Sequence, residues 1–558
     1  MWSSNWPVSP GPSRSTRRWC RRPTPASARN TGSPRTPISH PDRAAPPLSV
    51  LFRFSLFSLM NFRFPFTASA VTLALAAAVL TPLAAEAAPA PETSILRVNI
   101  TSQGYNFALP WQKQRPGTRR GLGALLEGNR VLVTAELAQD ATYIELEQAA
   151  SGKRISAQVE AIDYEVNLAT VVPVDAPGDF FKNMEPLVLD TGLKPRTALE
   201  VWQFEANGAP VTSTVDFDRV DLAPYFLEDQ VFLIFQANGA VQYRSGTFTL
   251  PVIHEGKLAG MLLRYNARDQ VSDILPAPMI ENFLKDVAQA PYEGLPSFGV
   301  RIAPTLDPQL RSYLKLDKYE GGVLINSVTP GFSGAAAGVK EGDVIVEING
   351  NKLDARGYYQ DPSYGLLSLG HLLRGACKVG DVMRMKLIRD GQPLDVDVRM
   401  LRKEANEFLV DPYVFDRQPR YLILGGILFQ ELTTPYLQLA GKEWKDRAPF
   451  RLVYAQANQD DFLKAGRKKL VFISGVLPAP CTIGYERLSG LIVNKVNGKE
   501  ITDLAALAAA VKLPENGIHR IEVTDGPRTI FIDDAQAKQD NEDFLPSRYR
   551  ITEMEQLK

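Results

Sequence analysis

Residues 321–350 read GGVLINSVTPGFSGAAAGVKEGDVIVEING, the most informative segment of the chain for its fold. A strand-like run is followed by an Ala- and Gly-rich helical segment (residues 330–338) and by a second strand-like run that ends in the turn signal Asn349-Gly350. Further along, the pattern predicts a helix from Tyr364 to Leu373 and a hairpin over residues 381–400. Together these elements predict a small α+β domain.

The series Gly-Val-Leu-Ile, Gly-Asp-Val-Ile and Ile-Asn-Gly within this stretch resembles that of PDZ domains. The resemblance implies a first PDZ-like domain over residues 295–402. Its tripeptide Phe298-Gly299-Val300 stands where PDZ domains hold the C-terminal carboxylate of a peptide on backbone N–H groups, while the peptide adds a strand to the sheet edge. Two residues of the predicted helix, His371 and Leu372, are further candidate peptide contacts. The alternative for His371 is an ordinary helical histidine without a ligand.

A second, degenerate copy of the pattern covers residues 420–534. It contains the strand and turn Leu491-Ile492-Val493-Asn494-Lys495-Val496-Asn497-Gly498 and a helix over residues 503–511. With its opening YLILGGILF (residues 421–429), this region resembles the second PDZ domain of plant-type Deg proteases. Its loop is imperfect, so packing against its own chain instead of a ligand is an open alternative. The charged tail, residues 535–558, is expected to be frayed.

Residues 94–290 consist of short β-like runs separated by Gly, Asn and Asp, and they close with a helical stretch over residues 277–287. Such a pattern predicts a β-barrel or a sandwich. Together with the two PDZ-like regions, the whole stretch from about residue 120 to 551 resembles the HtrA/Deg serine protease family. The resemblance implies a multidomain, mainly β fold, namely a trypsin-like double β-barrel followed by two PDZ (α+β) domains.

The resemblance also locates the positions of the catalytic triad. The chain has no histidine between His40 and His254, and Glu136 stands in the segment that presents the catalytic histidine in the family. Asn167 stands at the position of the aspartate, and Ser245 is the nominal nucleophile. Tyr243 replaces a glycine beside the expected oxyanion site. The sequence therefore predicts a dismantled catalytic site.

A triad needs an imidazole to accept the serine proton, and a carboxylate at Glu136 cannot reproduce its geometry. His254 follows Ser245 by only nine residues, on the next strand, so it is expected to point elsewhere. Ser245 is then an ordinary turn residue and Glu136 a solvated carboxylate at a helix start. The alternative is a serine endopeptidase in which Ser245 works with an unconventional base.

The N-terminus predicts export. Residues 1–59 hold nine arginines and one acid, and they lack the apolar surface needed to fold, so they are expected to be disordered or an upstream extension. Residues 60–88 have the design of a signal peptide, with an apolar run and the small-x-small site Ala85-Glu86-Ala87. The predicted location is periplasmic or otherwise outside the cytoplasm. An uncleaved membrane anchor and an organelle import signal are the alternatives.

The composition of the chain excludes some classes of partner and of binding site. Beyond residue 59 the chain has eight more acids than bases, which argues against nucleic acid. Its two cysteines there, Cys377 and Cys481, are too far apart for a disulfide framework, and no metal-ligand motif or cofactor motif is present. The predicted function is binding of protein segments or C-termini, in a chaperone-like or scaffold role. Family resemblance adds a homo-oligomer, a trimer, and an active Deg protease as a possible partner.

Overall fold

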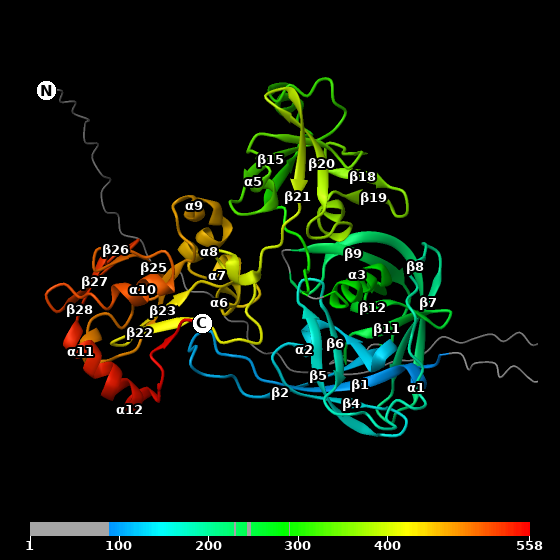
Figure 1. Cartoon of the computed structure of the whole chain (residues 1–558), viewed down its shortest axis with the longest axis horizontal. Helices are drawn as coiled ribbons and strands as arrows, with labels where there is room; N and C mark the ends of the chain where they lie inside the picture. Colours follow the sequence, from blue (N-terminus) through cyan, green and yellow to red (C-terminus); the bar gives the residue numbers. More distant parts are fainter. Residues whose placement is uncertain (1–88, 228–229, 243–246, 290) are drawn as a thin grey trace, which may run out of the picture. The chain divides into compact units, whose positions relative to one another are not determined.

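A computed structural model describes residues 89–227, 230–242, 247–289 and 291–558. The predicted leader and signal peptide therefore lie outside the described residues. All of the described residues belong to one compact unit. Three regions follow one another in this unit (Figure 1): a pair of barrels and two PDZ-like domains.

The first barrel is built from six strands in the order β1-β4-β5-β6-β3-β2, and the pairing of β1 with β2 closes it. A two-residue strand, β10, extends β2 in parallel. Its interior is filled by aliphatic side chains from alternate strand positions, as the period of a strand requires. The elements of this part of the chain are α1 (Pro91–Ser94), β1 (Ile95–Ser102), β2 (Gly117–Leu126), η1 (Glu127–Asn129), β3 (Arg130–Val133), α2 (Ala135–Ala138), β4 (Ala141–Glu147), β5 (Arg154–Asp163), β6 (Leu168–Pro173) and β10 (Thr247–Phe248).

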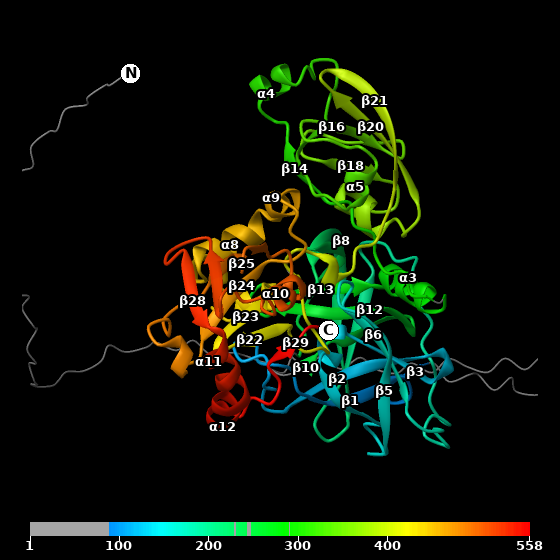
Figure 2. The same ribbon diagram turned by 60° about the vertical axis from the view of Figure 1, so that its left-hand side comes forward.

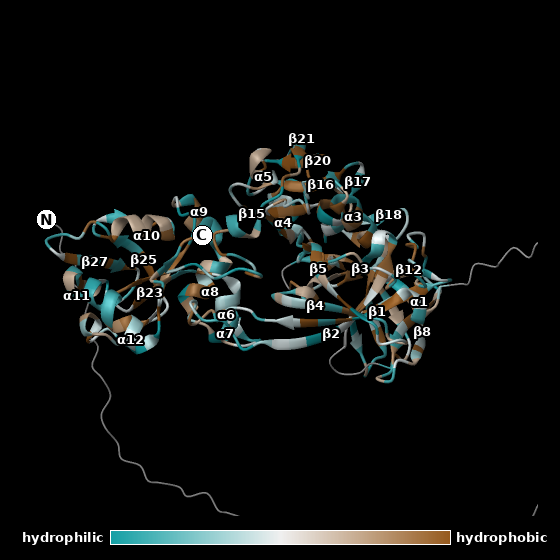
Figure 3. Cartoon of the chain, turned by 60° about the horizontal axis from the view of Figure 1, so that its bottom comes forward, coloured by the Kyte–Doolittle hydropathy of each residue, from teal (hydrophilic) through white to brown (hydrophobic). Residues whose placement is uncertain are grey.

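The second barrel is closed in the order β11-β12-β13-β9-β8-β7. Polar and apolar residues alternate along its longest strand, β8, so one face enters the core and the other meets water. Figure 3 shows this mixture of polar and apolar residues on the strands. The predicted helix over residues 277–287 is confirmed as α3. The elements are β7 (Ala198–Phe204), β8 (Pro210–Pro224), β9 (Val231–Asn238), β11 (Leu250–His254), β12 (Lys257–Asn266), β13 (Val271–Pro276) and α3 (Ala277–Val287).

The first PDZ-like domain has a sheet in the order β14-β15-β16-β20-β21, so β14 is an edge strand. The predicted Ala- and Gly-rich helix is α5, and the predicted hairpin over residues 381–400 is the pair β20–β21. The elements are β14 (Val300–Pro304), α4 (Pro308–Tyr313), β15 (Val323–Val328), α5 (Ser333–Ala336), β16 (Val344–Ile348), β17 (Asn351–Lys352), β18 (Tyr358–Asp361), β19 (Gly365–Ser368), η2 (His371–Gly375), β20 (Val382–Arg389), β21 (Gln392–Arg399) and, after the sheet, η3 (Ala405–Glu407).

The prediction of a helix from Tyr364 to Leu373 is wrong. The first half of that range is the strand β19, which forms a hairpin with β18, and only the single π-helical turn η2 follows. Gly365 lies at φ +79°, a left-handed conformation that interrupts the helical pattern, whereas Gly370 is in the right-handed helical conformation and leads into η2. The buried apolar residues of this range belong to a strand and a turn that follow one after the other.

The second PDZ-like domain contains the sheet β28-β27-β25-β24-β23-β22-β29. The predicted helix over residues 503–511 is confirmed as α10. A block of four short helices, α6 to α9, is inserted between β23 and β24. The elements are β22 (Tyr421–Leu424), β23 (Ile427–Glu431), α6 (Thr434–Gln438), α7 (Trp444–Arg447), α8 (Phe450–Ala457), α9 (Gln459–Lys464), β24 (Val471–Val476), η4 (Pro480–Thr482), β25 (Leu491–Val496), β26 (Lys499–Glu500), α10 (Leu504–Ala510), β27 (Ile518–Val523) and β28 (Thr529–Asp533).

The expectation of a frayed tail is also wrong. Residues 534–549 form α11 (Asp534–Gln539), η5 (Asp540–Phe544) and α12 (Leu545–Tyr549), which follow β28 (Figure 2), and β29 (Glu555–Gln556) pairs with β22. Leu545 and Ile551 are fully buried and anchor the tail to the sheet. The high charge density of the tail does not predict its structure, because its few apolar residues are the ones that pack. Among the described residues, no helix has the length and apolar character to cross a membrane.

Candidate functional site

Two of the three residues that the family resemblance predicts at the triad positions, here called triad-equivalent, meet at one end of the first barrel. Glu136 lies on α2, the short turn that follows β3, and Asn167 lies between β5 and β6. The Oδ1 atom of Asn167 accepts a 2.8 Å hydrogen bond from the backbone N–H of Glu136. Because the first N–H groups of a helix have no partner inside the helix, this amide supplies one from a distant segment. Asn167 adopts φ +54°, a left-handed conformation that asparagine tolerates well.

The surroundings of Glu136 differ from the solvated carboxylate that we expected. Its side chain is half-buried, and burial raises the pKa of Glu136, while the nearby Arg119 guanidinium opposes the rise. Arg119 also donates to the backbone carbonyls of Glu136 and Gln139, at 2.9 and 3.3 Å. The α2 turn is thus held at both ends by side chains from other elements.

Ser245 and Tyr243 lie outside the described residues, so their assignments stay predictions. The histidine nearest to them in sequence, His254, lies at the end of β11. Its Nδ1 atom is 2.7 Å from a carboxylate oxygen of Asp190, which precedes β7. This contact ties the β11–β12 hairpin to the loop before β7.

The candidate peptide loop of the first PDZ-like domain has a specific conformation. Gly299 adopts φ +73°, and a Cβ atom there would lie 2.1 Å from the Cβ of Phe332. The carbonyls of Phe298 and Gly299 accept hydrogen bonds from Gly334 and Thr329, so the loop is fixed from behind. Val300 then opens the edge strand β14. The structure therefore brings Phe298, Gly299 and Val300 together at the start of an edge that has no strand partner among the described residues.

His371 and Leu372 occupy a different environment from the one we predicted. Both are buried on η2, and the Nδ1 of His371 has no hydrogen-bond partner among the residues that the structure describes. Arg374, which lies on the same turn η2, forms an ion pair with Glu165 at 2.6 Å and a hydrogen bond with Gln230 at 2.9 Å. The turn therefore packs on the barrels, and this packing does not favour contact of His371 or Leu372 with a peptide.

No sequence pattern predicts the ion pair between Glu165 and Arg374. The two residues are 209 positions apart, and neither belongs to a motif. Burial raises the pKa of Glu165, and Arg374 counteracts the rise. Glu165 lies only two residues before Asn167, so this contact joins the first PDZ-like domain to the triad-equivalent segment.

In the second PDZ-like domain the equivalent edge is occupied. The strand β22 pairs along the whole of β23, and the turn between them is Gly425-Gly426. The strand that follows this glycine turn is β23, and by its place in the sheet order it corresponds to β14 of the first domain. The strand β22 therefore lies where an added peptide strand would lie. The structure thus supports the alternative in which this domain packs against its own chain.

We find no evidence for a metal site or a reactive thiol in the described part of the chain. No group of three or more His, Cys, Asp and Glu side chains there is arranged to hold a metal ion. Cys377 and Cys481 are both free thiols. Burial raises the pKa of Cys377 to about 12, which leaves it a protonated and unreactive thiol.

Comparison with known proteins shows what the chain is similar to. Models of the PDZ domain match residues 293–357 and 410–555. The chain is 26% identical over 428 residues to Protease Do-like 2, chloroplastic, of Arabidopsis thaliana, which covers 75% of this chain and 68% of the relative. It is 24% identical over 471 residues to Protease Do-like 4, mitochondrial, of the same plant, with 79% and 84% covered.

Among solved structures, the HtrA-type protease AlgW with a decapeptide matches at 15% identity and a TM-score of 0.43, covering 56% of this chain and 96% of that one. The sequence matches carry the conclusion. The chain is a homologue of the HtrA/Deg proteases, with trypsin-like barrels followed by two PDZ domains.

Proposed function

We propose that this chain is an exported, non-catalytic Deg/HtrA-like protein that binds protein segments or C-termini through its first PDZ-like domain. The observation that carries the proposal is the free edge of β14, which follows directly after the Phe298-Gly299-Val300 loop. An extended peptide added there satisfies the unpaired N–H and C=O groups of the edge. Val300 is partly exposed and Ile302 is 38% exposed on this strand, so apolar side chains are available to the ligand.

The loss of catalysis is supported by Glu136 and Asn167, which form a closed structural contact at the triad-equivalent positions. An asparagine amide whose oxygen already accepts a backbone N–H supports a turn and does not orient a base. The barrels then serve as a platform for assembly. By family resemblance we include in the proposal a homotrimer, an active Deg protease as a partner, and a location outside the cytoplasm.

A peptide-binding experiment tests the proposed binding function of the first PDZ-like domain. A fluorescent library of C-terminal peptides should bind the wild-type chain, and Ile302→Asp should remove binding because a charge enters the strand edge. Tyr313→Asp, at an 83% exposed position on α4, is the matched control and should bind as wild type does. Equal binding by wild type and Ile302→Asp contradicts the proposed groove, and so does the absence of any binding peptide.

The loop itself provides a second pair of variants. Gly299→Ala places a Cβ against Phe332, whereas Gly338→Ala, also at positive φ, meets no atom within 4 Å. Both variants place alanine in the strained left-handed conformation, so they differ only in the clash of the new Cβ with Phe332 in Gly299→Ala. We expect Gly299→Ala to weaken peptide binding much more than Gly338→Ala does.

A second candidate function is serine endopeptidase activity at Ser245. Two observations favour it: the homologues are proteases, and burial raises the pKa of Glu136, which makes this carboxylate a better proton acceptor. A fluorophosphonate probe and unfolded casein decide between the two. Labelling and cleavage that Ser245→Ala abolishes establish the protease, whereas identical behaviour of wild type and Ser245→Ala excludes it.

A further inference from the structure

The linker between the two PDZ-like domains passes over the face of the barrels that carries the triad-equivalent residues. We call residues 409–418 the strap. The ring of its Phe415 lies 4.5 Å from that of Tyr164 and 5.4 Å from that of Phe226, measured between ring centroids. Tyr413 stacks on Phe415 at 5.4 Å with nearly parallel planes and also contacts Tyr164 at 5.7 Å. Four aromatic rings therefore form one cluster.

The positions of these rings in the fold are informative. Tyr164 belongs to the first barrel, in the turn between β5 and β6, and it precedes Asn167 by three residues. Phe226 belongs to the second barrel, in the connection between β8 and β9. Phe415 contacts both, so it bridges the two barrels next to the segment that carries Asn167.

A polar contact fixes the strap beside the rings. The backbone N–H of Asp140 donates to the carboxylate of Asp416 at 2.8 Å, and the N–H of Asp416 donates to the carboxylate of Asp140 at 2.9 Å. The hydroxyl of Tyr164 also donates to Asp416. Asp140 follows Glu136 by four residues, so the strap contacts both triad-equivalent segments.

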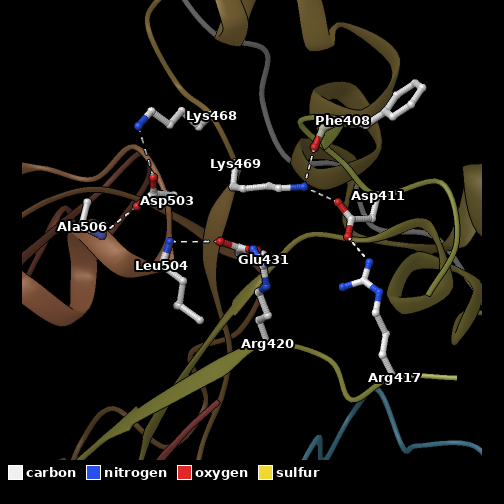
Figure 4. Close-up of polar contacts among 10 residues, drawn as sticks. All are labelled: Phe408, Asp411, Arg417, Arg420, Glu431, Lys468, Lys469, Asp503, Leu504 and Ala506. Atoms are coloured by element: carbon white, nitrogen blue, oxygen red, sulfur yellow. Dashed lines mark hydrogen bonds and ion pairs between the residues drawn. The ribbon is translucent and has the colours of Figure 1, made fainter. Parts of the chain in front are cut away.

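The base of the strap is held by buried charges on the second PDZ-like domain (Figure 4). Lys469 donates to Asp411 and to the carbonyl of Phe408, and Arg417 forms an ion pair with Asp411 at 2.7 Å. The side chains of Lys469 and Asp411 are only 7% and 8% exposed. The base is therefore a fixed part of the domain, whereas Phe415 and Asp416 reach out to the barrels.

We propose that Tyr164 and Phe226 form a binding slot for an aromatic side chain of an extended protein segment, and that Phe415 occupies this slot as an internal ligand. The ligand class is an unfolded or flexible segment that carries Phe or Tyr. The proposal builds on the proposed role in binding protein segments, but it assigns a second site on the barrels, separate from β14. While Phe415 is in place, the slot is closed to other ligands.

The energies of these contacts allow an external segment to replace Phe415. A pair of aromatic rings contributes about 0.5–1.5 kcal/mol beyond its buried area. A tethered ligand acts at an effective concentration in roughly the millimolar range, so an external segment must compete against that concentration. An external segment with several contacts can therefore displace Phe415, and removal of Phe415 should raise the apparent affinity for such a segment.

The probe for this site is a fluorescent peptide with the sequence of residues 409–418, LVDPYVFDRQ. We expect the double variant Phe415→Ala/Asp416→Ala to bind it at least about tenfold more tightly than wild type, because the internal competitor is gone. The variant Phe450→Ala, at an 81% exposed ring on α8, is the control and should bind as weakly as wild type. A probe with alanine in place of its phenylalanine should lose binding.

Further variants separate this site from the β14 groove. On the double-variant background, Tyr164→Leu should remove probe binding, whereas Ile302→Asp should leave it unchanged. Binding that Ile302→Asp removes and Tyr164→Leu does not would place the probe in the groove and overturn the slot. Equal probe affinity for wild type and double variant overturns it as well.

If the double variant does not fold, hydrogen exchange on the wild type replaces it. A saturating amount of probe should speed exchange of the amides of residues 413–416, because the strap leaves the slot. Unchanged exchange at saturation contradicts the proposal. The peptide library test on β14 fails or succeeds independently of this result.

Discussion

The side-chain oxygen of Asn167 accepts a hydrogen bond from the backbone N–H of Glu136, over 2.8 Å. These are the two positions at which the family resemblance predicts the aspartate and histidine of a triad. Their contact shows that the first barrel keeps these two segments adjacent. The amide oxygen now completes the first turn of α2, which is a structural task.

The first prediction concerns this hydrogen bond. Asn167→Ala should destabilise the chain by about 1–3 kcal/mol, because a buried N–H loses its acceptor. Asn167→Asp keeps an acceptor oxygen and should cost less than Asn167→Ala. Urea denaturation followed by circular dichroism measures both, and a larger loss for the aspartate variant would contradict the assigned role.

The buried charges below the strap give the second prediction. Lys469→Met should destabilise the second PDZ-like domain by about 3–5 kcal/mol, because Asp411 loses a buried partner. Lys468→Met is the matched control: its side chain is 77% exposed and lies 4.0 Å from Asp503, so it should change stability by less than about 0.5 kcal/mol. Denaturant midpoints of the two variants check the difference. Equal midpoints would mean that the base of the strap is not buried in solution.

The third prediction is a pH dependence from His519. This side chain is 1% exposed, its Nδ1 lies 3.2 Å from the amide nitrogen of Asn497, and its Nε2 lies 3.0 Å from Asp534. The neutral ring fits both partners if Nδ1 accepts and Nε2 donates. Burial lowers the pKa of His519, although Asp534 opposes the change.

Because the pKa of His519 in the folded chain lies below its ordinary value of 6.5, the unfolded chain binds more protons. The stability contribution is therefore present above pH 6.5 and declines as the pH falls through the lowered pKa. We expect the melting temperature of the second PDZ-like domain to fall between pH 7.5 and pH 5. His519→Gln should flatten this dependence, and an unchanged slope in that variant would assign the dependence to other groups.

The fourth prediction concerns the strap. Burial raises the pKa of Asp416, with a further rise from Asp140, while the hydrogen bonds from Tyr164 and from the Asp140 backbone oppose it. A carboxyl whose pKa is raised stabilises the docked state fully below its ordinary value of 3.8 and loses that contribution as the pH rises through the raised pKa. The strap amides should therefore exchange hydrogen faster at pH 7 than at pH 4.5, after correction for intrinsic rates. Asp416→Asn should remove this pH dependence, and a dependence that persists in the asparagine variant excludes Asp416 as its source.

Local patterns predicted most of the elements and missed those that depend on partners far away in the chain. The β-rich character of residues 94–290, the helices α3, α5 and α10 and the β20–β21 hairpin follow from periodicity and turn signals. The range from Tyr364 to Leu373 was misread because buried leucines are common to strands and helices, and the choice is made by packing on the barrels. The tail was misread because its charges conceal the two apolar residues, Leu545 and Ile551, that anchor it.

Local patterns and composition predict the short β-like runs, the two PDZ-like regions and the absence of histidine between His40 and His254, whereas the double barrel and the triad positions are what the family resemblance implies. Only the tertiary structure decided that Asn167 caps α2, that His371 is buried beside the barrels, that β22 occupies the edge of β23 and that Phe415 bridges Tyr164 and Phe226. Each of these contacts joins residues that are tens to hundreds of positions apart. Such contacts are fixed by the burial of whole surfaces, and no local pattern records which surfaces meet.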